Sequence, residues 1–375
     1  MNVERKKEKM KKINTEYTGS RSEISLGWLL LAATTLIVFL FSTAPAQGVA
    51  SAYPRREVSV SRIDSVGFTV SDMDRAVDFY TRVLPFEKTS DTEVWGEDYE
   101  NLSGVFGARV RIVRLRLGDE VLELIEYLTP RGRPVPLDSR SNDRWFQHVA
   151  IIVADMDKAY AVLRANKVRH ASTAPQTLPS YIAAAAGIKA FYFKDLDDHV
   201  VEILSFPPDK GAPKWHALEK TGKLFLGIDH TAIVVASTDE SLKFYRDILG
   251  LSVAGTSDNY GPEQEHLNNV RGARLHITGL KTKDPGINVE FLEYKDPIDG
   301  RPFPADTRGS DLWHWQTTFR TVDVQPFFVS YKPVFVSGGI AALADTRLGF
   351  KQAATVRDPD GHAVRVAAFY TENLF

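Results

Sequence analysis

The feature that most constrains this chain is a short unit that occurs four times between residues 61 and 370. Each copy begins with a stretch rich in apolar and β-branched residues, as expected of a buried strand. Self-similarity of this kind is the signature of a chain built from repeated supersecondary units. The four starting stretches are 63–70, 146–153, 228–235 and 314–319.

The second part of the unit is a helix with clear start signals. Asp72 and Asp155 each precede a stretch whose apolar residues recur every three or four positions. An Asp side chain at a helix start accepts hydrogen bonds from backbone N–H groups that have no partner within the helix. The aromatic pairs 79–80 and 244–245 occupy the same place in the first and third copies, and we expect them to face the core.

The unit ends in short β-rich stretches. Residues 121–127 and 289–294 are near copies of each other, whereas 195–202 and 358–365 share an Asp-rich turn before an alternating strand. A turn of this composition before such a strand is typical of a hairpin. Each unit is therefore predicted to be a strand, a helix and about three further strands.

A longer duplication relates the two halves of the chain. Arg133–Arg140 matches Arg301–Arg308 at an offset of 168 residues, which also separates His148 from Gln316. We read these arginine-rich segments as crossover straps, and the offset predicts that units one and two pair in one half, and three and four in the other. The predicted domains are residues 53–206 and 227–375, joined by a linker at 207–226 that begins with a Pro-rich turn.

Composition excludes several classes of protein. The chain has no cysteine, so disulfide scaffolds, thiolate metal sites and thiol catalysis are ruled out. Its 46 basic and 48 acidic residues give a net charge of −2, so there is no general attraction to nucleic acid. Any metal site must use His, Glu, Asp or Gln.

Residues 1–52 have the composition of a targeting segment. A basic stretch precedes the apolar run 24–41, and small residues follow around Ala46 and Ala52. This order predicts a secretory signal that is cleaved after one of these alanines. The alternative is an uncleaved membrane anchor through residues 24–41, a length close to the minimum for a spanning helix. In either case we expect the remaining chain to be exported, in the periplasm or outside the cell.

The four units, with Phe-Tyr in the helix and Asp-Pro-Asp-Gly-His at 358–362, resemble the vicinal oxygen chelate superfamily. That superfamily includes glyoxalase I, bleomycin resistance proteins and extradiol dioxygenases. The resemblance implies an α+β fold in which four βαβββ modules pair into two cup-shaped mixed or antiparallel sheets. One scaffold of this kind hosts many reactions, so the pattern is more specific for the fold than for the chemistry.

In that superfamily a divalent ion is held by His or Gln from the first strands of paired modules and by Glu from the last strands. The resemblance carries these roles over to one residue per module position: Ser65, Glu123, His148 and Glu202 in the first half, and His230, Glu290, Gln316 and Arg365 in the second. Ser65 is not a ligand of the expected type, and Arg365 stands where a carboxylate is expected.

The first half therefore keeps Glu123, His148 and Glu202 as implied metal ligands, with Glu123 and Glu202 as implied catalytic carboxylates. The second half keeps His230, Glu290 and Gln316 as a weaker set, in which we expect Arg365 to pair with Glu290. His314 lies on the same strand face as Gln316 and is an alternative ligand if the register shifts. We expect the first half to be the working site, so that His148→Ala abolishes metal binding and His230→Ala has a mild effect.

The resemblance also implies a function. We expect one divalent ion (Fe, Mn, Ni, Zn or Co) and a metal-dependent lyase or isomerase, like glyoxalase or an epimerase, that chelates vicinal oxygens of a small substrate. One alternative is a non-catalytic small-molecule-binding protein of the resistance type. A second is an extradiol-type ring-cleaving dioxygenase, which Gln316 and Arg365 argue against. No nucleic-acid partner is expected, and membrane contact only through the N-terminal segment.

Overall fold

The computed structural model describes residues 60–330 and 333–370. The predicted signal or anchor at residues 1–52 lies outside this described part. No helix among the described residues is long and apolar enough to span a membrane.

The first half of the chain contains two modules of the predicted order. The elements of module 1 are β1 (Ile63–Thr69), α2 (Met73–Arg82), β2 (Glu87–Trp95), α3 (Glu97–Ser103), β3 (Arg109–Leu117) and β4 (Glu120–Thr129). Those of module 2 are β5 (Gln147–Val153), α4 (Met156–Ala165), β6 (Arg169–His170), β7 (Gln176–Thr177), β8 (Lys189–Lys194) and β9 (Val200–Ser205).

The second half repeats this order after a short helix, α5 (Pro213–Glu219). The elements of module 3 are β10 (Phe225–Val234), α6 (Thr238–Tyr245), β11 (Ser252–Asn259), α7 (Pro262–Asn268), β12 (Arg274–Lys281) and β13 (Asn288–Asp296). Those of module 4 are β14 (Trp315–Thr321), α8 (Gln325–Ser330), β15 (Val334–Phe335), β16 (Ala341–Ala342), the 3₁₀ helix η1 (Thr346–Leu348), β17 (Phe350–Arg357) and β18 (Ala363–Phe369). The prediction of four repeated units and the prediction of an α+β fold are thus both confirmed.

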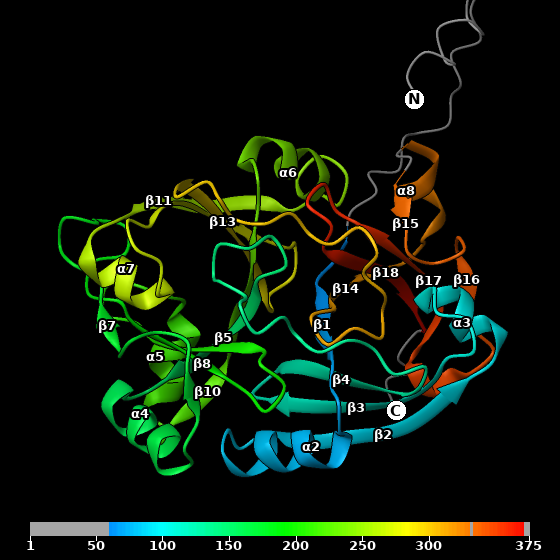
Figure 1. Ribbon diagram of the computed structural model, residues 1–375, viewed down its shortest axis with the longest axis horizontal. Helices are drawn as coiled ribbons and strands as arrows, with labels where there is room; N and C mark the ends of the chain where they lie inside the picture. The colour runs from blue at the N-terminus through cyan, green and yellow to red at the C-terminus, as the bar shows by residue number, and fades with distance from the viewer. Residues whose placement is uncertain (1–59, 331–332, 371–375) are drawn as a thin grey trace, which may run out of the picture. The chain divides into compact units, whose positions relative to one another are not determined.

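The strands form two nine-stranded sheets, and each sheet combines one module from each half of the chain. We call them the outer-module sheet, from modules 1 and 4, and the inner-module sheet, from modules 2 and 3. At their centres β1 pairs antiparallel with β14, and β5 pairs antiparallel with β10. In Figure 1 the inner-module sheet, with β5, β8 and β10, lies to the left of β1, β14 and β18.

The predicted pairing of units one with two and three with four is therefore wrong. The 168-residue offset records that the halves are duplicates, but either pairing of the units would preserve it. Module 2 continues into module 3 within one sheet through the segment that contains α5, whereas both arginine-rich straps cross between sheets. The predicted division at 207–226 consequently falls in the middle of the inner-module sheet.

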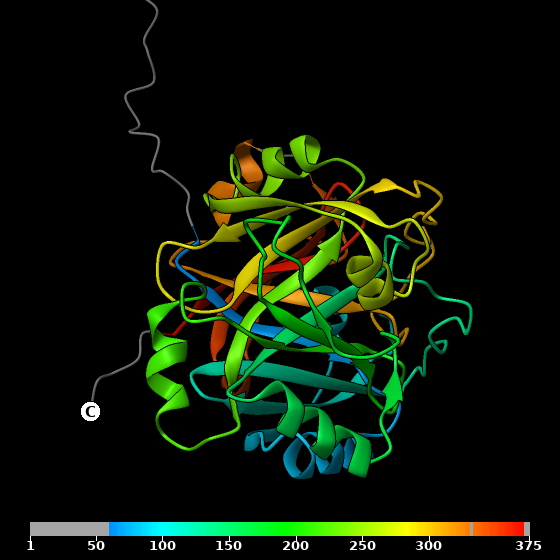
Figure 2. The same ribbon diagram turned by 90° about the vertical axis from the view of Figure 1, so that its left-hand side faces the viewer.

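One large apolar core joins the two sheets. It contains residues from the central strands of both sheets together with the buried faces of α2, α4 and α6. Helices α2 and α4 lie next to each other against it in both views (Figures 1 and 2). The aromatic pairs Phe79–Tyr80 and Phe244–Tyr245 are buried there, as predicted from their helical spacing.

The helices begin where the sequence indicated. Asp72 and Asp155 accept hydrogen bonds from the backbone N–H groups of Arg75 and Lys158, and Ser237 caps α6 in the same way. Such a cap satisfies one of the four N–H groups that a helix leaves unpaired at its start. The capped helices can therefore begin immediately after the first strand of each module.

The two straps clasp each other reciprocally. A guanidinium nitrogen of Arg133 lies 2.7 Å from a carboxylate oxygen of the buried Asp311, and the group stacks on Trp313 at 4.7 Å. Arg301 makes the same contacts with Asp143 at 2.7 Å and with Trp145 at 4.6 Å. Because each strap supplies the arginine for the other, the clasp holds the two crossing segments together.

Candidate metal centre

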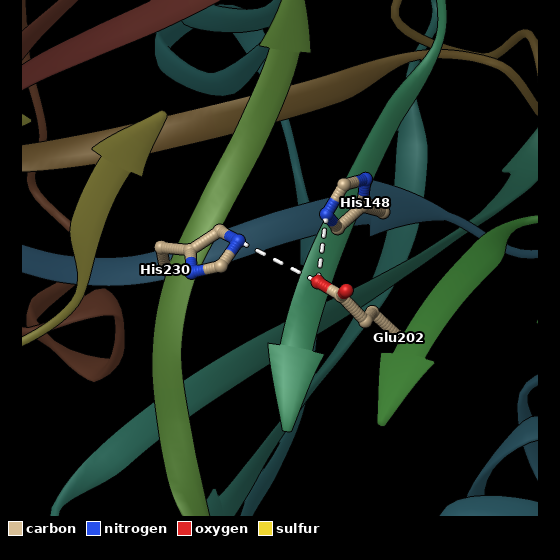
Figure 3. A group of neighbouring side chains, drawn as sticks. All are labelled: His148, Glu202 and His230. Carbon is tan, nitrogen blue, oxygen red and sulfur yellow. Dashed lines mark ion pairs between the residues drawn. The ribbon is translucent and has the colours of Figure 1, made fainter. Parts of the chain in front are cut away.

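Three side chains converge on one face of the inner-module sheet (Figure 3). The Nε2 atom of His148 lies 3.2 Å from Oε2 of Glu202, and Nε2 of His230 lies 3.5 Å from the same oxygen. All three atoms lie within 4.8 Å of one another, and all three residues are buried. This is the spacing of atoms that could share one metal ion.

Strand register brings these residues together. Ala232 on β10 is opposite His148 on β5, and Ala150 on β5 is beside Glu202 on β9. Because side chains alternate along a strand, His148, Glu202 and His230 all point to the same face, while Val149 and Ile151 enter the large core on the other. All three residues were predicted to be metal ligands, but His148 and His230 were expected to belong to two separate sites.

Glu290 completes the group on the fourth strand. Its Oε2 atom lies 3.5 Å from Nε2 of His230, and β13 places it beside Ala232. The side chain of Glu290 is 27% exposed, against 0%, 4% and 8% for His148, Glu202 and His230. A substrate would therefore reach this group from the side of Glu290.

The histidine nitrogens fit the needs of a metal ligand. The Nε2 atoms of His148 and His230 are buried and make no hydrogen bond with the described residues, although a carboxylate oxygen lies close to each. Their N–H directions therefore miss that oxygen, and a buried polar atom without a partner is costly. An ion between the three side chains would satisfy these atoms.

A further carboxylate orients His230. Oδ2 of Asp229 lies 3.1 Å from Nδ1 of His230, and Asp229 in turn accepts a 2.8 Å hydrogen bond from Nε1 of Trp215. A carboxylate on the second ring nitrogen fixes the tautomer that directs Nε2 toward a metal. Sequence reasoning missed Asp229, although the Asp-His pair at 229–230 was visible.

The electrostatics of the group favour one neutral histidine and one protonated histidine in the metal-free protein. Burial lowers the pKa of His148. Burial also opposes a charge on His230, but the carboxylates of Glu290, Asp229 and Glu202 outweigh it and raise the pKa of His230. A bound divalent cation would take the place of that proton, since a metal ligand must be deprotonated.

The two glutamates differ in basicity. Burial acts against ionisation of Glu202, but the adjacent His148 and His230 hold its pKa below the usual range. Burial, together with the charges of Glu202 and Asp229, raises the pKa of Glu290 to about 6 despite the nearby His230. Glu290 is therefore the carboxylate that most readily accepts a proton near neutral pH.

The outer-module sheet carries the other four predicted residues at equivalent positions. Register places Gly67 between Glu123 and Gln316, and Thr318 beside Arg365, so Ser65, Glu123, Gln316 and Arg365 form one set. There Nη1 of Arg365 lies 3.2 Å from Oε1 of Glu123, and Nη2 donates to Gln316 at 3.0 Å. The guanidinium supplies the positive charge that a metal would supply in the other sheet.

Two expectations about these residues are corrected. Arg365 pairs with Glu123 and not with Glu290, because module 4 shares a sheet with module 1. Glu123, predicted as a catalytic metal ligand beside His148 and Glu202, lies in the other sheet and is bound by two arginines, Arg114 and Arg365. Glu123 was grouped with His148 and Glu202 because modules 1 and 2 are consecutive in the chain, but module 1 shares its sheet with module 4.

Strand register puts Gln316, and not the alternative His314, at the predicted ligand position. Gln316 pairs with Gly67, which places it in the column equivalent to His148. His314 lies before β14 begins and is buried; burial and the nearby Arg357 and Arg365 lower its pKa to about 3.

Two glycines leave space beside Glu290. Gly279 on β12 pairs with Glu290, and Gly255 on β11 pairs with Gly279. A Cβ atom at Gly255 would meet nothing within 4 Å, and one at Gly279 would meet only a carbonyl oxygen at 3.8 Å. The equivalent partner of Glu123 is Arg114, whose guanidinium fills this space. The space beside Glu290 is thus open in the inner-module sheet, whereas the equivalent space beside Glu123 in the outer-module sheet is filled.

Known proteins share this architecture. The family model "Glyoxalase/Bleomycin resistance protein/Dioxygenase superfamily" matches residues 62–203 and 227–366. A 2-epi-5-epi-valiolone epimerase from Actinomyces sp is 34% identical over 156 residues, which cover 40% of this chain and 81% of that protein.

Two solved structures are similar over most of the chain. A glyoxalase I mutant from Zea mays has a TM-score of 0.55 at 14% identity, covering 82% of this chain and 94% of its own. A putative dioxygenase from Bacillus subtilis has a TM-score of 0.51 at 12% identity, covering 82% of this chain and 85% of its own. At such low identity these likenesses concern the fold alone.

Proposed function

Because the chain belongs to the Glyoxalase/Bleomycin resistance protein/Dioxygenase superfamily, we propose that it is a metal-dependent isomerase of a small hydroxy-carbonyl compound. The observation that carries this proposal is the convergence of His148, Glu202 and His230, with Glu290 beside them at the open side. The similarity to an epimerase supports the same reaction class.

Three residues would hold the ion. His148, Glu202 and His230 offer two imidazole nitrogens and a carboxylate oxygen, a donor set that suits Fe, Mn, Co, Ni and Zn. A divalent ion bound there would polarise a carbonyl oxygen of the substrate and so acidify the adjacent C–H group. Asp229 keeps His230 in the tautomer that this role requires.

Glu290 is the residue that we propose to move the proton. Burial and the charges of Glu202 and Asp229 raise its pKa to about 6, close to neutral pH, and a general base is most effective when its pKa is near the pH of the reaction. Oε2 of Glu290 would take the proton from the carbon next to the carbonyl and later release it to solvent. A water molecule on the opposite face would give a proton to the same carbon, which yields the epimer and regenerates the Glu290 carboxylate. Glu202 is less basic and lies between two histidines, so its role is to hold the ion.

The experiment uses the purified chain loaded with Mn, Fe, Co, Ni or Zn and incubated with 2-epi-5-epi-valiolone in D₂O. Nuclear magnetic resonance should show a second epimer with deuterium at the inverted carbon. Glu290→Gln should stop the exchange while keeping the metal, because the three ligands remain, whereas His148→Ala should lose both.

Three other results would contradict the proposal. Oxygen consumption with a catechol would favour a ring-cleaving dioxygenase. Binding of the ketone without any exchange would favour a resistance-type binding protein. Full activity in Glu290→Gln would show that another residue moves the proton.

A further inference from the structure

We infer that Asn259, Gln264 and Asn268 form a wall that binds substrate hydroxyl groups, and that the substrate is a neutral polyhydroxylated carbonyl compound. This inference rests on the proposed function and specifies its substrate class. We call these three residues the amide wall. Asn259 ends β11, and the other two residues lie on α7, all in module 3 of the inner-module sheet.

The amide wall is a continuous string of buried hydrogen bonds. Nδ2 of Asn259 donates to Oε1 of Gln264 at 2.9 Å, Nε2 of Gln264 donates to Oδ1 of Asn268, and Nδ2 of Asn268 donates to the hydroxyl of Tyr294 at 2.8 Å. The three amides are only 3%, 2% and 1% exposed. Their orientations are therefore fixed before a ligand arrives.

Each amide has donor capacity left over. A carboxamide nitrogen carries two hydrogens, yet each nitrogen of the wall makes one side-chain hydrogen bond within the described residues. Each of the three nitrogens thus has one N–H group for which the described residues provide no acceptor, and leaving a buried donor unpaired is costly. The hydroxyl oxygens of a ligand are suitable acceptors.

The other sheet shows that this wall is not a requirement of the fold. Strand register makes Val94 the equivalent of Asn259. Val94 pairs with Val110, which pairs with Tyr127. In the same way Asn259 pairs with Leu275, which pairs with Tyr294. The third and last residues of α3 are Tyr99 and Ser103, at the places of Gln264 and Asn268 in α7. Amides occur at all three positions only in the sheet that has the histidines, among the described residues.

The amide wall and the candidate metal centre adjoin the same apolar cluster of the inner-module sheet. Tyr192 contacts His148 with ring centroids 4.8 Å apart and the rings tilted by 43°. Tyr294, which ends the amide string, accepts the hydrogen bond from Asn268. Tyr192, Tyr294 and Ala232 are all members of that cluster.

A cavity of about 190 Å³ reaches the end of the wall. Asn268, Phe146 and Val200 are among the residues that line it. Phe146 also contacts His148 edge to face, with ring centroids 5.6 Å apart. Phe146 thus borders both the cavity and His148. The charged Arg140 and Lys194 in the cavity lining are paired with Asp299 and Asp198. Uncharged amides with no free cation beside them suit hydroxyl groups better than phosphate or carboxylate.

The test compares two ketones that share the reacting group. One is 2-epi-5-epi-valiolone, a polyhydroxylated cyclohexanone, and the other is 2-hydroxycyclohexanone. Asn268→Ser and Asn259→Val introduce the residues that the other sheet carries at these positions. We expect each variant to raise KM for the polyhydroxylated ketone about 3–10-fold, the equivalent of one lost hydrogen bond of about 1 kcal/mol, with kcat and metal content preserved.

For 2-hydroxycyclohexanone the same variants should change KM less than twofold. The matched control is Ser103→Ala, at the equivalent helix position of the other sheet, which should change neither KM. Equal changes of KM for both ketones, or no change for either, would overturn the inference while leaving the isomerase proposal intact. Should Asn259→Val not fold, Asn268→Ser alone decides the result.

A second measurement separates the wall from the reaction. If the wild type turns over neither ketone, binding of myo-inositol, an unreactive cyclic polyol, is measured by saturation-transfer nuclear magnetic resonance. Binding that Asn268→Ser weakens and Ser103→Ala does not would support the wall while the proposed isomerase reaction fails. No binding to the wild type, or equal binding to all variants, would overturn the inference.

Discussion

At the scale of residues, the two sheets differ by one decisive exchange. Glu202 and Arg365 occupy equivalent positions on β9 and β18, and the charge at this position determines what the neighbouring side chains do. Beside Glu202, two histidines remain without hydrogen bonds at Nε2. Beside Arg365, Glu123 and Gln316 are already bound to a guanidinium. The first arrangement can accept a cation, and the second already contains one.

The first prediction concerns the two histidines. His148→Ala and His230→Ala should both abolish metal binding, because each removes one of three ligands from a single site. The loss should exceed the roughly 10–100-fold drop in affinity that follows loss of an outer-shell partner such as Asp229. Titration calorimetry with Zn²⁺ checks this.

The matched control is Gln316→Ala, which changes the residue equivalent to His148 in the other sheet and should leave Zn²⁺ binding intact. The expectation from the sequence that His230→Ala would be mild rested on placing the two histidines in different halves, which strand pairing contradicts. If His230→Ala binds Zn²⁺ as tightly as the wild type does, the earlier expectation is correct and the single shared site is wrong.

At the scale of elements, the turns before the last strands explain how the modules are locked together. Asp195 binds His199 within the turn that precedes β9 and accepts a hydrogen bond from Tyr80 on α2, 3.1 Å away. Asp358 binds His362 and Tyr245 in the equivalent way before β18. His199 and His362 are thus part of buried polar contacts between modules.

These turns predict a dependence of stability on pH. Nδ1 of His199 lies 2.8 Å from Asp195, and Nε2 lies 2.7 Å from the carbonyl oxygen of Leu312. Burial opposes the charge on His199, but Asp195 raises its pKa above the ordinary value. A raised pKa in the folded state gives stability that is complete below about pH 6.5 and is lost as the pH rises through the folded value, at about 1.4 kcal/mol per unit of separation.

Urea unfolding at pH 6 and pH 9 measures this effect. The wild type should lose more free energy of unfolding across this interval than His199→Gln, which cannot carry the charge. His170→Gln, at an exposed histidine, is the control and should follow the wild type. The same pH dependence in His199→Gln and the wild type would rule out the charged pair.

A prediction about β12 concerns the open space beside Glu290. Gly279→Arg should place a guanidinium where Arg114 lies in the other sheet, pair with Glu290 and greatly reduce both metal binding and turnover. Gly279→Ala should retain both, because a Cβ atom there meets nothing closer than 3.8 Å. Zn²⁺ affinity and proton exchange in the proposed substrate check the pair, and an active, metal-binding Gly279→Arg would show that substrates approach from elsewhere.

At the scale of the whole molecule, the sequence predicted the repeat unit and the strand positions of His148, Glu202, His230 and Glu290, but not which units pair. The positions followed from local patterns, such as the near copies 121–127 and 289–294, which register confirms as equivalent. The pairing depends on where the straps cross, and the chain offset is identical for either arrangement. The same limit hid the amide wall, since Asn259 and Gln264 became informative only when compared with Val94 and Tyr99.

The N-terminal segment gives a separate prediction, because it lies outside the described residues. Its basic stretch, apolar run and small residues favour export with cleavage after Ala46 or Ala52. Mass spectrometry of the protein isolated from its own cells should find a mature chain that starts at one of these sites. Recovery of a membrane-bound chain that still begins with Met1 would favour the anchor.

The most direct test of the central claim is anomalous X-ray diffraction from crystals of the chain grown with Zn²⁺ or Mn²⁺. The account predicts one strong anomalous peak among His148, Glu202 and His230, within about 2.0–2.2 Å of their ligand atoms. It predicts no peak beside Glu123, where Arg365 already provides the positive charge. A peak at Glu123 and Gln316, or none at the two histidines, would contradict it.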